Sequence, residues 1–97
     1  FMSGLVGNEE SIGEESLVAE THSIFKQMKA VLSAYKLSLA DVVKCTVFLD
    51  NVDEWGKFNS VYKQYFTKPY PARSALGADG LALGASLELE CIAEFKN

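Results

Sequence analysis

Arg73 is the only arginine in the chain, and its type makes it the first candidate for chemistry. It follows Pro71 at the start of a short apolar segment. A guanidinium stays charged at physiological pH and binds a carboxylate or phosphate through two parallel hydrogen bonds. An exposed ion pair would use the same side chain. The residue type alone therefore leaves two interpretations open, an anion-binding arginine or an ordinary surface ion pair.

Glu88 and Glu90 are the carboxylates that the spacing places together. They lie two positions apart in an alternating segment, and residues at that spacing in a strand point to the same face. A carboxylate on such a face can act as a general acid or base if the face lines a pocket. A polar strand face is more commonly just solvated, which is the alternative. We take Arg73 with Glu88 as the pair expected to act on a small molecule that bears a carboxylate.

Three more residues could contribute polar groups to a site. Ser3 and Gly4 follow a first short strand and can offer a hydroxyl and a backbone amide to an anion, although most such pairs form turns. Asn59 interrupts an apolar stripe, so its amide is expected to meet a partner, either a strand or a ligand. No Cys/His cluster has the spacing of a zinc site, so the sequence predicts no metal.

Two helices are expected to position these side chains. Apolar residues recur at helical spacing over 16–35, which predicts an amphipathic helix with Glu20 on its solvated side. A second helical stripe covers 52–66, with Asp50 or Asn51 as its cap.

Four segments are expected to form strands: a stub that ends at residue 4, then 43–49, 72–76 and 86–95. Val43 and Phe95 are placed on the buried faces of their strands. The order of elements favours a single α+β domain over 1–97, with two helices packed on one face of a mixed sheet. Since 48% of the residues are hydrophobic, the chain can build a core.

Composition excludes several classes of protein. The net charge is −4 and the basic residues are scattered, which argues against a protein that holds nucleic-acid backbones. No apolar run reaches the roughly 18 residues that a membrane span requires. Cys45 and Cys91 each lie in an alternating apolar segment, which predicts two buried thiols and fits a reducing, cytosol-like compartment.

Five segments, in this order, resemble the Rid family of reactive-intermediate (enamine/imine) deaminases, also called YjgF or L-PSP. The resemblance extends from Phe1 to Phe95, and its most specific parts are the Pro-Ala-Arg-Ser element and the Glu-x-Glu-x-x-Ala strand. The segments are Phe1-Met2-Ser3-Gly4, residues 41–49 (DVVKCTVFL), Phe58-Asn59-Ser60-Val61-Tyr62, Pro71-Ala72-Arg73-Ser74 and residues 87–93 (LELECIA).

The resemblance implies a chorismate-mutase-like fold that forms homotrimers around a barrel-like centre, with active sites in clefts between subunits. It implies hydrolysis of 2-imino or enamine acids, such as 2-iminobutanoate or 2-iminopropanoate, to 2-keto acids and ammonia. It also implies that the partners are a small imino or keto acid and copies of the chain itself, with no metal or organic cofactor. The cytoplasmic location that we expect rests on the two cysteines alone. Some family members have been described as endoribonucleases or translation inhibitors.

Carried over by position, Arg73 matches the arginine that clamps the substrate carboxylate, and Glu88 matches the acid that positions or activates water. Ala75 stands where many members have a cysteine whose backbone contacts the substrate. The other positions expected to bind substrate are Ser3, Gly4, Asn59 and Ser74.

Two departures from the family pattern leave other functions open. Leu81-Ala82 stands where many members have Leu-Pro, and the strand pair that normally precedes Ser3-Gly4 and supplies a tyrosine is expected to be missing. A trimeric module that binds a small metabolite without turnover is therefore the alternative to a deaminase. An RNA-cleaving protein is a third possibility, and the acidic charge argues against it.

Overall fold

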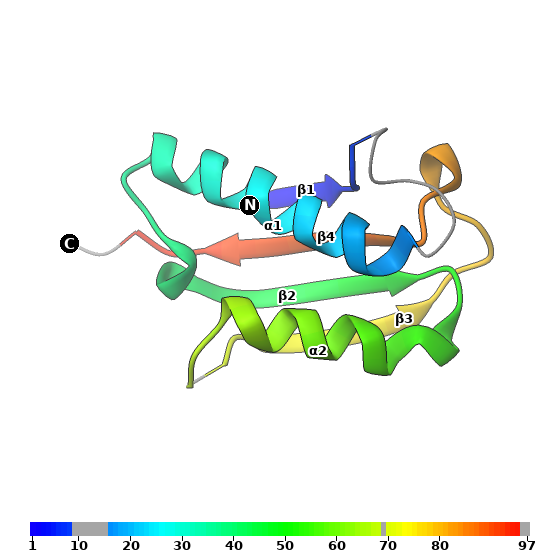
Figure 1. Cartoon of the computed structure of the whole chain (residues 1–97). Helices are drawn as coiled ribbons and strands as arrows, with labels where there is room; N and C mark the ends of the chain where they lie inside the picture. The colour runs from blue at the N-terminus through cyan, green and yellow to red at the C-terminus, as the bar shows by residue number, and fades with distance from the viewer. Residues whose placement is uncertain (9–15, 69, 96–97) are drawn as a thin grey trace.

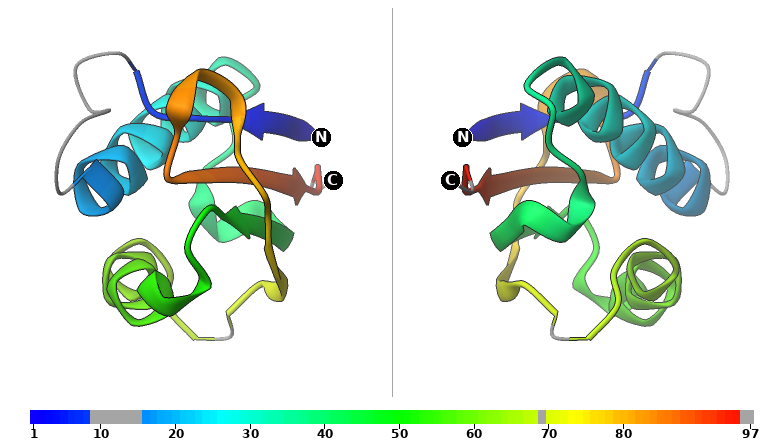
Figure 2. Two further views of the ribbon diagram at one scale, coloured as in Figure 1. Left: turned by 90° about the vertical axis from the view of Figure 1, so that its right-hand side faces the viewer. Right: turned by 90° about the vertical axis from the view of Figure 1, so that its left-hand side faces the viewer.

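The computed structural model describes residues 1–8, 16–68 and 70–95, which form a four-stranded sheet and two helices (Figure 1). Both helices lie on the same side of the sheet (Figure 2). This confirms the expected α+β class. The elements are β1 (Met2–Leu5), α1 (Ser16–Ala34), β2 (Val42–Leu49), α2 (Trp55–Tyr65), β3 (Ala72–Gly77) and β4 (Leu87–Ala93).

The sheet is mixed because α2 carries the chain back across it. A strand, a helix and a second strand in succession place β3 parallel to β2. β4 then runs antiparallel to both β2 and β1, so the order across the sheet is β1-β4-β2-β3. β3 is therefore an edge strand of the sheet.

Aromatic side chains join the two helices over the sheet. Phe25 of α1 is fully buried, and its ring stacks on Tyr65 with a centroid distance of 4.4 Å. The same ring meets Tyr62 and Phe66 edge to face. Burial of such large rings supplies much of the hydrophobic stabilisation of a small domain. The cluster holds α2 in a defined position relative to the sheet.

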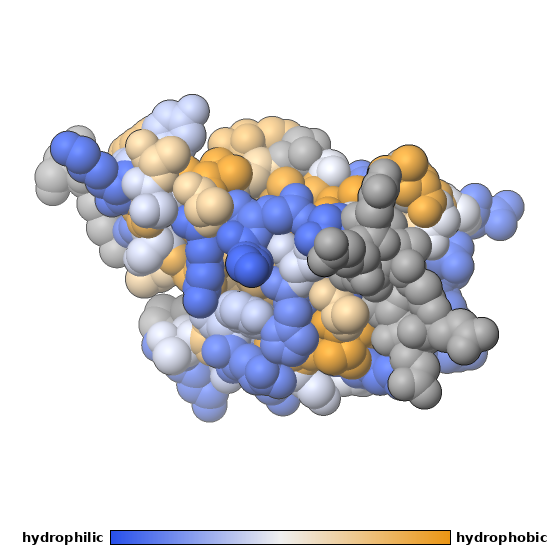
Figure 3. Space-filling model, turned by 45° about the horizontal axis from the view of Figure 1, so that its top comes forward, coloured by the Kyte–Doolittle hydropathy of each residue, from blue (hydrophilic) through white to orange (hydrophobic). Residues whose placement is uncertain are grey.

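Glu20 is buried, which corrects the prediction that it lies on the solvated side of α1. Its exposed fraction is 0%, and its Oε1 accepts a hydrogen bond of 2.8 Å from the backbone N–H of Ser86. Ser86 lies just before β4, so the connection that enters β4 meets this part of α1. Val31 and Tyr35, two of the apolar residues that recur at helical spacing over 16–35, are exposed. On the face that Figure 3 shows, hydrophilic residues predominate and hydrophobic ones form separate patches.

The ends of two strands also differ from prediction. Val43 is exposed and Val42 takes the buried position, because the pairing of β2 with β4 is irregular between Val42 and Lys44. A shift of one residue moves a side chain to the opposite face of a strand. Phe95 is 67% exposed, because β4 ends at Ala93.

The cap before the second helix is Asn51, one of the two predicted residues. Its Oδ1 accepts a hydrogen bond of 3.0 Å from the backbone N–H of Asp53. The capped element is a short 3-10 turn, Val52–Glu54, that leads directly into α2.

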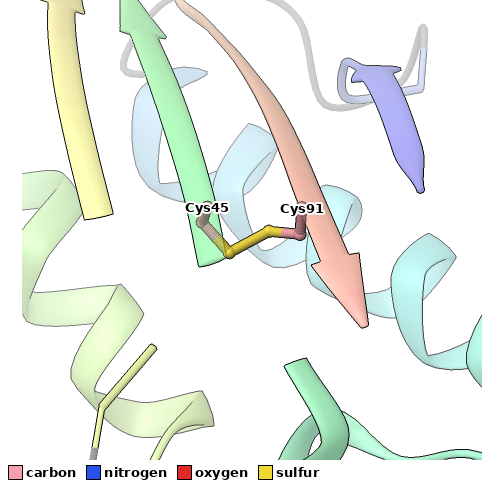
Figure 4. The surroundings of a disulfide bond; sticks show 2 residues. All are labelled: Cys45 and Cys91. Atoms are coloured by element: carbon pink, nitrogen blue, oxygen red, sulfur yellow. A yellow bond between two sulfur atoms is a disulfide. The ribbon is translucent and has the colours of Figure 1, made fainter. Parts of the chain in front are cut away.

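Cys45 and Cys91 form a disulfide with an S–S distance of 2.07 Å, which overturns the prediction of two free thiols (Figure 4). The antiparallel register of β2 and β4 places the two residues directly opposite each other. Both are almost fully buried, because they point to the face that the helices cover. The two residues are 46 positions apart, and only the strand register brings their sulfur atoms together.

Reduction of this disulfide should lower the free energy of unfolding by up to about 4 kcal/mol, because opening a loop of this length gives the unfolded chain more conformational entropy. Urea denaturation with and without reductant measures the difference. The double variant Cys45→Ala/Cys91→Ala is the control, since reductant should not shift its midpoint. A wild-type urea midpoint that is the same with and without reductant would contradict the prediction.

Candidate active site

Arg73 lies on the helix side of β3, between two aromatic rings of α2. Its partner across the parallel pairing is Cys45, whose side chain faces the helices. The guanidinium carbon is 4.6 Å from the ring centroid of Trp55 and 4.5 Å from that of Tyr62. Stacking of this kind is favourable because each ring face carries negative charge density. It also restricts the plane in which the guanidinium can lie.

Asn59 binds one edge of the planar guanidinium. Nη1 of Arg73 donates a hydrogen bond of 2.9 Å to Oδ1 of Asn59, which confirms that the amide meets a partner. Trp55, Asn59 and Tyr62 share one face of α2 because they are spaced at four and three residues. Among the described residues the guanidinium has no other hydrogen-bond partner, so its remaining N–H groups are available to a ligand.

A pocket of about 280 Å³ opens beside Arg73. Its wall combines residues of α2 with the segment that enters β3. Of the lining residues that the structure describes, two are cationic and none is acidic. They are Asn59, Tyr62, Lys63, Tyr70, Pro71 and Arg73. A pocket of this size and charge suits a small anion.

Glu88 lies on the opposite face of the sheet. On β4 it alternates with the buried Leu87 and Leu89, and its strand partner on β2 is Phe48. Its Oε2 is 3.8 Å from the point where a Cβ would stand on Gly4. Gly4 has a φ of +68°, which residues other than glycine rarely adopt, so the backbone conformation there favours glycine. The carboxylate of Glu88 makes no hydrogen bond within the described part of the chain.

The structure thus forms two groups of predicted site residues and does not join them within one chain. Arg73 and Asn59 form one group, and Glu88 and Gly4 form the other. Strand geometry places the Cα atoms of Arg73 and Glu88 roughly 14 Å apart, with side chains on opposite faces. Of the remaining predicted positions, Ser74 and Ala75 are exposed on β3, and the side chain of Ser3 lies outside what the structure describes.

The sequence profile of the family described as Endoribonuclease L-PSP matches residues 1–95. The chain belongs to this family. The match confirms the resemblance to the Rid (YjgF/L-PSP) proteins that the sequence motifs indicated.

Proteins of the L-PSP family that are similar to this chain have names that indicate different functions. A human protein named 2-iminobutanoate/2-iminopropanoate deaminase is 32% identical over 96 residues, which cover 96% of this chain and 70% of that protein. AldR of Lactococcus lactis, a candidate regulator by name, is 37% identical over 90 residues, covering 93% of this chain and 71% of its own. The crystal structure of RidA from the Antarctic bacterium Psychrobacter sp. PAMC 21119 superposes with a TM-score of 0.87 at 33% identity, over 96% of this chain and 77% of that one.

Within its described residues this L-PSP family member has neither a cluster of metal-binding side chains nor a membrane-spanning helix. No group of three or more His, Cys, Asp or Glu side chains lies close enough together to hold a metal ion. No helix in the described ranges combines the length and apolar character that crossing a bilayer requires.

Sequence reasoning missed four residues around the arginine of this L-PSP family member: Trp55, Tyr62, Lys63 and Tyr70. Trp55 and Tyr62 belong to the apolar stripe of α2, a pattern that by itself indicates core positions. Their spacing from Asn59 is the signal that could have found them, because residues three or four apart on a helix lie side by side.

Tyr62 is 2% exposed, and its hydroxyl has no hydrogen-bond partner among the described residues. Burial raises the pKa of this phenol above its ordinary value of 10.0, and the positive charge of Arg73 partly opposes the rise. The folded state therefore binds the phenol proton more tightly than the unfolded state. The resulting stabilisation is complete below the unfolded pKa and is lost as pH rises through the raised pKa.

Tyr62→Phe should raise the free energy of unfolding by about 1 kcal/mol at neutral pH, because it removes a buried hydroxyl without a partner and keeps the ring. The difference in free energy of unfolding between the variant and the wild type should increase above a pH of about 10. There the wild type begins to lose the stabilisation that comes from the raised pKa of its phenol. Urea denaturation of both proteins at neutral and alkaline pH measures the difference. A variant less stable than wild type would show that the hydroxyl has a partner in solution.

Proposed function

We propose that this protein hydrolyses 2-imino acids, such as 2-iminobutanoate and 2-iminopropanoate, to 2-keto acids and ammonia. Water adds to the imine carbon across the C=N bond, and the carbinolamine that forms then loses ammonia as the carbonyl appears. One water is consumed and one ammonia is released for each keto acid. No electron transfer is involved, so the reaction requires positioning and proton transfer alone.

The observation that carries this proposal is the environment of Arg73. The guanidinium lies over the rings of Trp55 and Tyr62, and its Nη1 donates a hydrogen bond to Asn59. The free N–H groups can bind the substrate carboxylate with two hydrogen bonds. A carboxylate held in this way would present the adjacent imine carbon in one orientation, which lowers the entropic part of the barrier.

Glu88 would then come from a second copy of the chain. Within one chain it faces away from Arg73, on the sheet face opposite α1 and α2. Exposed apolar residues on the strands, including Val43, Leu76 and Ile92, make that face suitable for self-association. In a homotrimer with clefts between subunits, Glu88 of one copy could accept a proton from the water that attacks the imine bound at Arg73 of its neighbour.

Clearance of an imine tests the proposal. Threonine dehydratase with threonine releases the imine of 2-oxobutanoate, and semicarbazide traps any imine that persists. Added protein should accelerate release of the keto acid and reduce the trapped fraction. No acceleration with imines from several amino acids would overturn the proposed hydrolysis.

The rival candidate is a module that binds a small carboxylate without turnover. The separation of Arg73 from Glu88 within one chain favours it, because the arginine pocket needs no catalytic acid to bind an anion. Saturable binding of a keto acid, with no acceleration in the imine assay, would select this candidate.

We also propose a cytoplasmic location, where enzymes that use pyridoxal phosphate release imines. Disulfides are rare in that compartment, so the Cys45–Cys91 disulfide of the structure is the observation that argues against this location. Counting reactive thiols in protein denatured immediately on cell lysis under alkylating conditions tests the location. Two alkylated cysteines support a reducing compartment, and none supports an oxidising one.

A further inference from the structure

The pocket beside Arg73 carries more positive charge than a single carboxylate requires. Arg73 and Lys63 both line it, and among the described residues no acidic side chain does. The whole chain has a net charge of −4, so this local excess of positive charge runs against the overall composition. A cationic pocket on an acidic protein points to a ligand with more than one negative charge.

Lys63 is placed to reach a second anionic group. It follows Asn59 by four residues on α2, so the two side chains lie on the same face, separated by about 6 Å along the helix axis. Asn59 is the residue bonded to Arg73. Lys63 forms no ion pair with any described residue, whereas Lys57 on the same helix pairs with Glu54 at 3.6 Å.

The separation of about 6 Å along α2 is of the same order as the length of a short dicarboxylate. The two carboxyl carbons of a four- or five-carbon dicarboxylic acid stand roughly 4 to 5 Å apart, given C–C bonds of about 1.5 Å. One carboxylate held by Arg73 would leave the other near the ammonium of Lys63. The pocket, at about 280 Å³, is large enough for a molecule of this size.

We propose that Lys63 is a specificity-determining residue that makes the pocket prefer 2-imino acids with a second carboxylate on the side chain. These are the imines of aspartate-like and glutamate-like amino acids. The inference rests on the proposed function and goes beyond it by naming the class of substrate. Lys63 contributes binding and does not take part in proton transfer.

The test compares two imines made in the assay by amino-acid oxidases with catalase present. One is the glutamate imine and the other is the neutral imine of alanine. The wild type should show the higher kcat/KM for the glutamate imine. Lys63→Met keeps the aliphatic stem and should lower that preference about tenfold, because the loss of kcat/KM falls mainly on the glutamate imine.

Lys57→Met is the matched control, because it removes the same charge from the same helix outside the pocket. It should leave the preference unchanged. A wild type that favours the alanine imine, or a Lys63→Met variant with an unaltered preference, overturns the inference while the deaminase proposal stands.

Binding of the products separates this failure from failure of the proposed function. Calorimetry should show that 2-oxoglutarate binds more tightly than 2-oxobutanoate and that Lys63→Met removes the difference. If no imine is hydrolysed and this difference is still seen, the deaminase proposal fails and the pocket's preference for a dicarboxylate stands. Equal binding of the two keto acids by the wild type overturns the inference whatever the rates.

Discussion

Arg73→Lys should lower kcat/KM for 2-iminobutanoate by about a hundredfold, because the lysine keeps the charge and loses the two-pronged hydrogen bond to the carboxylate. A guanidinium also fits as a flat group between the rings of Trp55 and Tyr62, which an ammonium cannot reproduce. Steady-state kinetics in the coupled imine assay measures the loss. An activity close to wild type would remove Arg73 from the mechanism.

The fold of the variant needs its own measurement, since Arg73 also packs on two rings. Circular dichroism and urea denaturation should show a folded protein with modestly reduced stability. Asn59→Ala provides a graded comparison, because it removes only the hydrogen bond that orients Nη1. It should reduce kcat/KM less than Arg73→Lys does.

Glu88→Gln should lower kcat about a hundredfold and change KM little, because the amide cannot accept a proton from the attacking water. The side chain is close to isosteric, and the carboxylate makes no hydrogen bond within the described residues that the change would break. Glu90→Gln is the matched control on the same strand face, and it should leave turnover near wild type. Equal losses in the two variants would contradict a specific role for Glu88.

Mixing inactive subunits tests whether the two residues act across an interface. If each site uses Arg73 of one copy and Glu88 of the next, an equal mixture of Arg73→Lys and Glu88→Gln subunits, refolded together, should recover about a quarter of wild-type activity through mixed trimers. Recovery near zero would show that both residues of a site come from one chain. Each variant refolded alone gives the baseline.

The helices were predictable because their signals are local. The stripe over 16–35 predicted α1 within one residue at its end, and the turn chemistry around Asn51 placed the start of the second helical region. The alternation of Leu87, Leu89 and Cys91 likewise predicted which face of β4 is buried. Periods of 3.6 and 2 residues are properties of neighbours in the chain, so sequence carries them directly.

The candidate residues were also visible in the sequence, while their grouping was not. The chemistry of a lone arginine and of paired glutamates marked Arg73 and Glu88, and the family motifs reinforced both. Neither signal indicates which face of a sheet each side chain occupies relative to the other. The pairing of β3 with β2, and of β2 with β4, put them on opposite faces.

The sequence by itself therefore determined the element types, the α+β class and the family of this protein. Tertiary structure alone decided the disulfide between Cys45 and Cys91, the burial of Glu20 and the position of Arg73 between Trp55 and Tyr62. Each of these features depends on strand register or on the position in which a helix packs against the sheet. Strand register and helix position are set by packing between segments that are far apart in the chain. No local pattern of residues encodes that packing.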